Sequence, residues 1–138
     1  MKRRVFFLLI FAFLPLLFSA CTAGYTLKVN PDSISPTGLV LTVRRTAIPG
    51  NCTFGEDFTI DQKTDAGWEP VPVLDPDMNY CFVSIGYELF PGLWKTMPID
   101  WSYLYGELPP GRYRIGKGVS AGKERPDVTV WAEFEIKE

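Results

Sequence analysis

The side chains of this chain that could perform covalent chemistry are its cysteines and serines, but the base that usually activates them is missing. The sequence has 138 residues, of which three are cysteine and none is histidine. Histidine is the commonest general base in enzymes and the commonest metal ligand. Ser120 and Lys123 have the spacing of a serine–lysine pair, yet they lie in a glycine-rich stretch with nothing to desolvate the lysine. We therefore expect no catalytic residue and no enzymatic activity.

Carboxylates are the other candidates for chemistry, because they bind hard metal ions. Residues 75–79 place oxygen-bearing side chains at alternate positions, as the start of a calcium loop does. The complete loop needs glycine at its sixth position and glutamate at its twelfth, where this chain has Tyr80 and Gly86. A second acidic group has the composition of a solvated strand face: Glu56, Asp57, Asp61 and Asp65. We expect a polar turn and an exposed surface there, with no metal site and no cofactor.

Cys21 is the cysteine with the clearest chemical context. Basic residues 2–4 are followed by an uncharged run over residues 5–20, which is the pattern of a secretory signal peptide cut after Ala20. The run is short for a membrane span, and Pro15 breaks it. Residues 17–21, Leu-Phe-Ser-Ala-Cys, resemble the lipobox of bacterial lipoproteins. That resemblance implies a lipidated Cys21 as the mature N-terminus and a stable membrane anchor; ordinary cleavage after Ala20 is the alternative.

The remaining 118 residues are enough for one domain. The leader carries three of the 14 basic residues, so 11 basic and 16 acidic residues remain, a net charge of −5. Nucleic-acid binding depends on clustered lysine and arginine, and an acidic body is not attracted to anionic lipid. We expect no nucleic-acid partner and a membrane attachment through Cys21 alone. Residues 1–20 are then the leader, 21–24 a tether and 25–138 a domain on the extracytoplasmic face of the cell membrane.

Two cysteines are left for the folded domain, Cys52 and Cys81. An even number of cysteines in an exported chain predicts a disulfide. The closed loop of about 30 residues would stabilise the domain by roughly 3–4 kcal/mol. The alternative is two separate thiols that pack as small apolar residues.

The elements that position these residues are predicted to be strands. Apolar and polar residues alternate most clearly over residues 128–136, which is typical of a strand with one face on a core. Shorter alternating runs cover residues 25–29, 39–43, 58–60, 81–85, 97–101 and 113–115. The chain has 12 prolines and 12 glycines, and turn signals separate the runs. We predict an all-β, immunoglobulin-like Greek-key β-sandwich of seven to eight strands, with one helical turn within residues 100–105 and a long loop over residues 117–127.

One local motif supports this fold. Leu108, Gly111 and Tyr113 stand in the order Leu-x-Pro-Gly-x-Tyr, which resembles the tyrosine corner of Greek-key sandwiches. In that corner the tyrosine hydroxyl binds the backbone a few residues upstream while the ring packs into the core. The alternative is an ordinary Pro-Gly turn before a strand.

The wider chain resembles bacterial immunoglobulin-like domains of small exported lipoproteins, chiefly of Firmicutes. The most specific stretch is residues 100–117, DWSYLYGELPPGRYRIGK, and further matching pieces lie at residues 35–39, 54–56, 67–72 and 132–136. The resemblance implies the fold and the cellular address, and it implies no activity or ligand. The two domain cysteines are not part of the family pattern, so the resemblance does not support their pairing.

The best candidates for a binding contact are Trp94 and Trp131. Trp131 stands on the same strand face as Thr129 and Glu133, so it should point outward from the sheet. The alternative is that side chains of an adjacent strand cover it. We expect the domain to be a non-catalytic module that binds an envelope or secreted protein, or serves as a structural accessory. Two alternatives remain: a protease inhibitor that presents the loop at residues 90–94 or 108–111, and a carbohydrate-binding module that uses the tryptophans.

Overall fold

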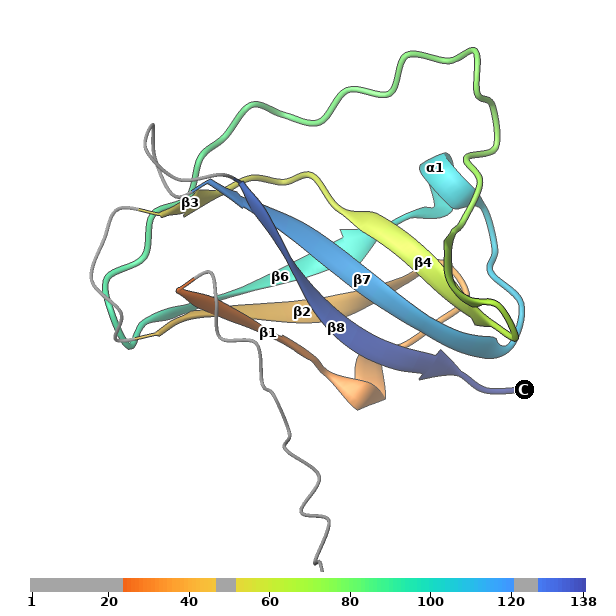
Figure 1. Cartoon of the computed structure of the whole chain (residues 1–138), viewed down its shortest axis with the longest axis horizontal. Coiled ribbons are helices and arrows are strands. Elements are labelled where there is room, and N and C mark those ends of the chain that lie inside the picture. Colours follow the sequence, from red (N-terminus) through yellow and green to blue (C-terminus); the bar gives the residue numbers. More distant parts are fainter. Residues whose placement is uncertain (1–23, 47–51, 121–126) are drawn as a thin grey trace, which may run out of the picture.

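The computed structural model describes residues 24–46, 52–120 and 127–138. These residues form two antiparallel sheets that pack face to face (Figure 1). The first sheet contains β1 (Tyr25–Val29), β2 (Gly38–Arg45) and β6 (Trp94–Asp100). The second contains β3 (Thr53–Phe54), β4 (Thr59–Thr64), β5 (Gly67–Pro70), β7 (Gly111–Ser120) and β8 (Val128–Ile136). The predicted all-β sandwich is confirmed, with eight strands among the described residues.

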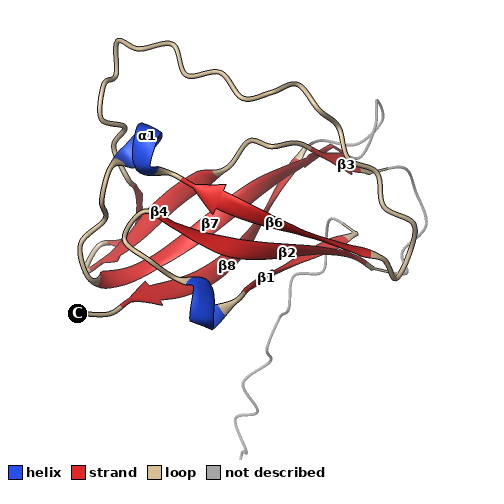
Figure 2. Cartoon of the chain, turned by 180° about the vertical axis from the view of Figure 1, so that it is seen from behind, coloured by secondary structure: helices blue, strands red, loops and turns tan. Residues whose placement is uncertain are grey.

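The strand order fixes which edges of the sandwich stay open. In the first sheet β2 lies between β1 and β6, and in the second β7 pairs with β4, β8 and the short β3, while β5 continues beyond β4. The edge strands β1 and β8 therefore lie beside each other along one side of the molecule, and the rear view shows the same arrangement (Figure 2). Among the described residues no helix has the length and apolar character to cross a bilayer.

The core lies between the sheets and follows from the alternation of residues along each strand. Leu41 of β2 and Ile115 of β7 are completely buried, and their neighbours two residues away point to the same side. Trp101, which follows β6, is also completely buried, and its indole N–H donates to the carbonyl oxygen of Pro36 at 2.9 Å. The largest aromatic residue of the core is thus tied to the turn before β2.

The predicted helical turn is present as α1 (Ser102–Tyr105). Ser102 is its first residue, and the Asp100 carboxylate accepts hydrogen bonds from both the backbone N–H and the hydroxyl of Ser102. Gly106 ends the turn with a φ of 72°, a conformation that glycine adopts without steric cost.

Two stretches differ from the sequence-based prediction. Residues 81–85 form no strand. In the connection 71–93 the backbone is hydrogen-bonded to strands at Val71, at Tyr87, which lies opposite Phe54, and at Gly92 and Leu93, which bond to Arg45. This part of the connection runs beside the outer edge of β6, where Pro98 has no N–H to donate to a ladder. The second difference is at the end of β7, which continues to Ser120 and so includes Lys117, predicted to begin a loop. The rest of that predicted loop, residues 121–126, lies outside the described residues.

Candidate binding surface

The connection between β5 and β6 carries most of the large apolar side chains that the described residues expose. We call residues 71–89 the apolar segment. Leu74 is 62% exposed, Met78 55%, Val83 66% and Ile85 44%. Exposed apolar side chains that gather on one segment make that segment a candidate for an interaction. Long connections without regular structure are likewise usually functional.

Hydrogen bonds hold the apolar segment against the sandwich at both of its ends. At its start, the backbone N–H of Leu74 donates to the carbonyl oxygen of Leu104 in α1 at 2.9 Å. At its end, Tyr87 and Phe54 exchange two backbone hydrogen bonds of 2.8 and 3.1 Å. The Tyr87 hydroxyl also donates to Glu56, and this bond raises the pKa of Tyr87 above its usual value. The apolar segment is therefore held by the sandwich at both ends, and the exposed side chains lie on the stretch between them.

A tight turn follows the apolar segment and leads into β6; we call residues 90–93 the apolar turn. The Leu93 N–H donates to the Phe90 carbonyl oxygen at 3.0 Å, and Gly92 has a φ of 85°. Proline at the second position and glycine with positive φ at the third are the requirements of a type II turn. Phe90 is 79% exposed and Leu93 49% exposed. In the second loop predicted for an inhibitor, residues 108–111, Leu108 is buried, whereas Pro109 and Pro110 are exposed.

Trp94, one of the two tryptophans predicted to bind, lies immediately after the apolar turn and is 63% exposed. It lines a groove of about 720 Å³ on the outer face of the first sheet. The groove also contains the hydroxyls of Thr42 and Thr96, which are 3.2 Å apart, and the cations Lys28 and Arg44. An aromatic face beside hydroxyls and cations can bind a polar ligand such as a sugar.

Trp131, the second predicted binding residue, is covered by its neighbours. The guanidinium carbon of Arg114 is 4.0 Å from the centre of the Trp131 ring and 4.9 Å from that of Trp68. Arg114 also donates two hydrogen bonds, of 2.6 and 2.8 Å, to one oxygen of the buried Asp61 carboxylate. A Cβ atom added to Gly116 would lie 2.7 Å from the Trp131 ring, so this ring rests on the backbone of β7. Trp131 therefore offers less free surface to a ligand than Trp94 does.

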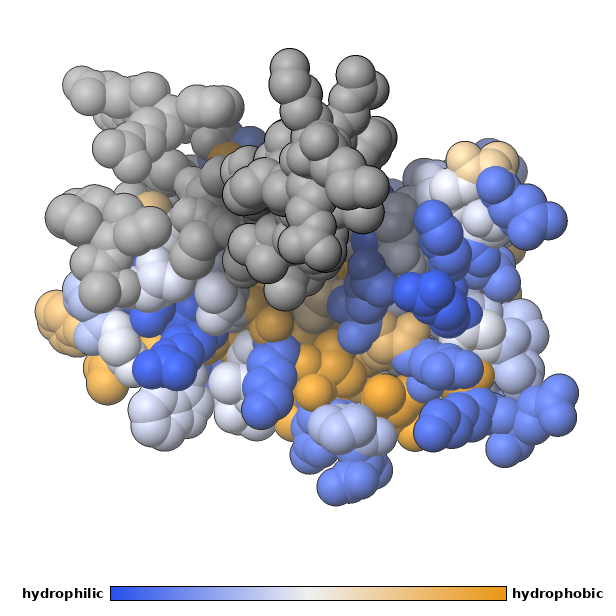
Figure 3. All heavy atoms as spheres, turned by 60° about the horizontal axis from the view of Figure 1, so that its bottom comes forward, coloured by the Kyte–Doolittle hydropathy of each residue, from blue (hydrophilic) through white to orange (hydrophobic). Residues whose placement is uncertain are grey.

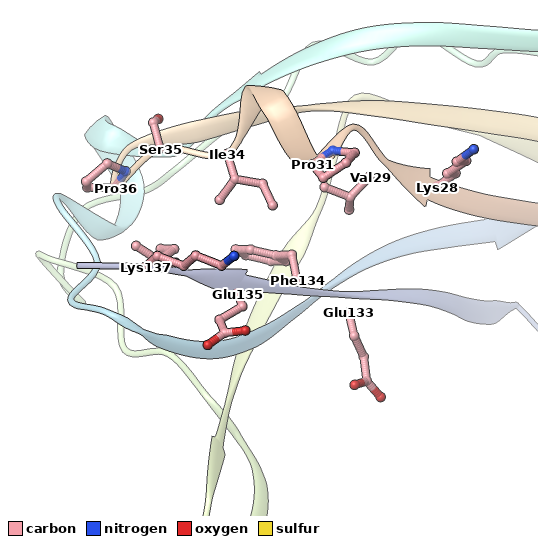
Figure 4. Close-up of a pocket in the computed structure, with 11 residues that line it drawn as sticks. Lys28, Val29, Pro31, Ile34, Ser35, Pro36, Glu133, Phe134, Glu135 and Lys137 are labelled. Atoms are coloured by element: carbon pink, nitrogen blue, oxygen red, sulfur yellow. The ribbon is translucent and has the colours of Figure 1, made fainter.

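The side of the molecule where β1 and β8 lie shows an apolar patch between hydrophilic side chains (Figure 3). It corresponds to a slot of about 570 Å³ between the two edge strands. Ile34 points into the slot toward β8, whereas Glu133 and Glu135 point away from it (Figure 4). Phe134 at its base is only 7% exposed, while Val29 and Ile34 are half-buried and contribute to its apolar lining.

The predicted disulfide is not formed. Cys52 is a buried free thiol and Cys81 an exposed one. The Cys52 carbonyl oxygen accepts a hydrogen bond of 2.6 Å from the Tyr25 hydroxyl, and Tyr25 lies at the end of the first sheet where β6 begins. Cys81 instead lines a cavity together with the last residues of β6, so the length of this strand separates the two cysteines. A strand of that length spans roughly 20 Å, while a disulfide requires Cα atoms within about 7 Å. An even count of cysteines cannot reveal such a separation.

The residues of the predicted tyrosine corner lie at the start of β7. The Tyr113 hydroxyl donates to the Pro109 carbonyl oxygen at 2.8 Å, and its ring stacks on Phe134 with 5.7 Å between centroids. Burial raises the pKa of the Tyr113 hydroxyl. Leu108 is buried and its N–H donates to the Pro36 carbonyl oxygen at 2.9 Å. Gly111 is the first residue of the strand.

Lys117 is a buried cation that sequence reasoning missed. Its residue surface is 0% exposed, and its Nζ atom has no hydrogen-bond partner among the described residues. Burial lowers the pKa of Lys117, an effect that Asp57 and Glu56 oppose from a distance. The missed signal was the alternation of Tyr113 and Ile115, which continues through Lys117 to Val119.

None of the remaining chemical motifs forms a catalytic or metal-binding arrangement among the described residues. Residues 118–122 read Gly-Val-Ser-Ala-Gly, the letters of a nucleophile elbow, but Ser120 ends a strand and pairs with Thr53, and the chain has no histidine. Among the described residues no group of three or more histidine, cysteine, aspartate or glutamate side chains could hold a metal ion. At residues 75–79 the Asp75 carboxylate accepts a hydrogen bond from the Asp77 N–H, as in a polar turn. Cys21 lies outside the described residues.

Two packed antiparallel sheets, with the hydrogen bond of a tyrosine corner at the start of β7, define an immunoglobulin-like module. The family model described as bacterial Ig-like domain matches residues 22–135, and the chain belongs to this family. Domains of the family are generally non-catalytic. Searches of curated proteins and of solved structures returned no match.

Proposed function

We propose that this protein is a lipid-anchored, extracytoplasmic binding module that docks a protein of the cell envelope through its apolar segment. The observation that carries the proposal is the exposure of Leu74, Met78, Val83 and Ile85 on one segment whose two ends are hydrogen-bonded to the sandwich. A partner that covers these side chains would gain the free energy of apolar burial, about 25 cal/mol per Å². Because both ends of the segment are held by the sandwich, part of its conformational entropy is already lost before binding.

The anchor is supported by the sequence alone. The uncharged run over residues 5–20 and the lipobox-like residues 17–21 predict export and acylation at Cys21. Acylation with several chains gives stable membrane attachment, so the partner would be reached from the outer face of the membrane. Fractionation of cells that express the Cys21→Ser variant tests this part: the variant should leave the membrane fraction.

The docking proposal is tested by photo-crosslinking in intact cells. A photoreactive amino acid replaces Val83 in one variant and Glu69, on the exposed edge strand β5, in the control. We expect a discrete adduct only from position 83. The purified partner should then bind the full chain, and Leu74→Ser with Val83→Ser should abolish that binding without changing the unfolding temperature. Equal adducts from both positions, or binding that survives the double substitution, would contradict the proposal. A secreted protease in the adduct would select the inhibitor alternative.

The groove beside Trp94 favours the carbohydrate alternative as a second candidate. Indole fluorescence of the full chain, titrated with neutral and anionic polysaccharides, tests it, because a sugar stacked on Trp94 would change its emission. The Trp94→Ala variant should lose the response. If no polysaccharide changes the emission, the groove is not a sugar site.

A further inference from the structure

The apolar turn lies at the end of the sandwich where the folded domain begins. Tyr25, the first residue of β1, is paired in register with Arg45, the last residue of β2. The Arg45 N–H donates to the Leu93 carbonyl oxygen at 2.8 Å, and the Gly92 N–H donates to the Arg45 carbonyl oxygen at 3.1 Å. The apolar turn is therefore hydrogen-bonded to the last residue of β2, and this residue is paired with the first residue of β1. Both views show the chain entering β6 at the end where β1 starts (Figures 1 and 2).

The side chains at this end are those that favour the interface of a membrane. Phe90 is 79% exposed, Leu93 49% and Trp94 63%. Tryptophan prefers the headgroup region, where its ring finds both apolar and polar surroundings. Phenylalanine and leucine contribute the apolar side of interfacial segments. Arg44 is paired in register with Trp94, is exposed, and makes no ion pair with a described residue. An exposed cation beside apolar side chains is attracted to anionic headgroups.

The length of chain before β1 limits how far this end can lie from the bilayer. Four peptide units separate Cys21 from Tyr25. Even a fully extended chain of that length reaches only about 14 Å. The headgroup region is itself several ångströms deep, and interfacial side chains enter it by roughly 5–10 Å. An acylated Cys21 would therefore hold Phe90 and Leu93 within reach of lipid.

We infer that the apolar turn is a second membrane contact, in which Phe90, Leu93 and Trp94 enter the lipid interface beside the anchor. This inference rests on the proposed acylation of Cys21. A single lipid attachment does not set the orientation of the domain, whereas a second contact fixes which end faces the lipid. Residues 71–74 and α1 lie at the opposite end of the sandwich (Figure 1), so the start of the apolar segment would point away from the membrane.

The test measures the contact of Trp94 with lipid. The full-length acylated protein is reconstituted into phosphatidylcholine–phosphatidylglycerol vesicles with and without brominated acyl chains, which quench nearby indoles. We expect quenching in the wild type and its loss in Trp94→Phe, which leaves only the three tryptophans at positions 68, 101 and 131. Phe90→Ser with Leu93→Ser should reduce the quenching of Trp94, while the protein still sediments with the vesicles. The matched control, Leu74→Ser with Val83→Ser, removes two equally exposed apolar side chains and should leave the quenching unchanged.

Two results would overturn the inference: no quenching of an acylated, vesicle-bound wild type, or equal quenching in the Phe90 and Leu93 double variant. The mass of the mature N-terminus, read from the same sample, separates this inference from the proposed anchor. An unacylated chain that still binds the vesicles and shows Trp94 quenching supports the contact and removes the anchor. Unchanged crosslinking at position 83 in the variant with Phe90→Ser and Leu93→Ser shows that protein docking is independent of the membrane contact.

Discussion

At the scale of single residues, Lys117 is the costliest side chain of the described core. It shares the inner face of β7 with Tyr113, Ile115 and Val119, all nearly inaccessible to water. A buried amine without a hydrogen-bond partner either stays charged at a large desolvation cost or gives up its proton. The methylene groups of the side chain fill the space that an apolar residue would fill, so the charge alone opposes folding.

The Lys117→Met substitution should stabilise the domain by about 1–3 kcal/mol, because methionine keeps the length of the side chain and removes the desolvated charge. Burial lowers the pKa of Lys117 from 10.5, so over the interval between the lowered pKa and 10.5 the unfolded chain binds more protons than the folded one. Wild-type stability should therefore rise with pH in that interval, and the contribution of Lys117 should vanish in the variant. Urea unfolding at several pH values measures both effects.

The exposed Lys137→Met variant is the control for the loss of a lysine and should change stability little. Lower stability in Lys117→Met than in the wild type would show that the amine has a stabilising partner.

Tyr113→Phe isolates the hydrogen bond at the start of β7. The ring and its stacking on Phe134 are retained, while the bond from the hydroxyl to the Pro109 carbonyl oxygen is lost. We expect a loss of about 1 kcal/mol, the net value of a typical hydrogen bond, in the free energy of unfolding. Tyr103→Phe is the control, since Tyr103 is 52% exposed. Equal effects of the two substitutions would show that the corner contributes nothing.

At the scale of elements, alternation of residues predicted most strands because each has one buried face. The run over residues 128–136 became β8, and 25–29 became β1. The same rule failed for residues 81–85, where Val83 and Ile85 alternate but are exposed. Alternation reports a pattern of side chains, whereas a strand also needs a neighbouring edge that can complete its ladder. The exposed segment that we propose as a docking site was therefore the part that the pattern could not predict.

Contacts between elements were also beyond the sequence. The stacking of Arg114 between Trp68 and Trp131 requires that β5, β7 and β8 be ordered across one sheet, which no local pattern encodes. The covering of Trp131 follows from that order. The tyrosine-corner motif was predictable because all of its residues are local in sequence.

Gly116→Ala tests the packing of β8 side chains on β7. The added Cβ would meet the Trp131 ring at 2.7 Å and the Thr129 methyl group at 2.8 Å, closer than real Cβ atoms approach. Moving the ring would disturb its stacking with Arg114, so we expect a destabilisation of about 1–3 kcal/mol by thermal unfolding. Gly86→Ala is the control, because no atom lies within 4 Å of its added Cβ. A variant at position 116 as stable as the wild type would show that the ring moves without cost.

At the scale of the whole molecule, the domain folds without a covalent crosslink between its described cysteines. A chain of about 118 residues buries roughly two-thirds of its unfolded surface, which is enough for stability without a disulfide. The unfolding temperature should therefore be the same with and without dithiothreitol. Iodoacetamide should label Cys81 in the folded protein and Cys52 only after unfolding. A clear fall in the unfolding temperature on reduction would contradict this.

For a chain acylated at Cys21, as proposed, the proline in β6 affects how copies of the domain meet on one membrane. Anchored proteins diffuse in two dimensions, where collisions between identical sheet edges are frequent and an unprotected edge would seed lateral polymerisation. Pro98 leaves a gap in the hydrogen-bonding groups along the edge of the first sheet, and the connection from β5 runs beside it. The β6 edge should consequently not act as a template for pairing between neighbouring copies.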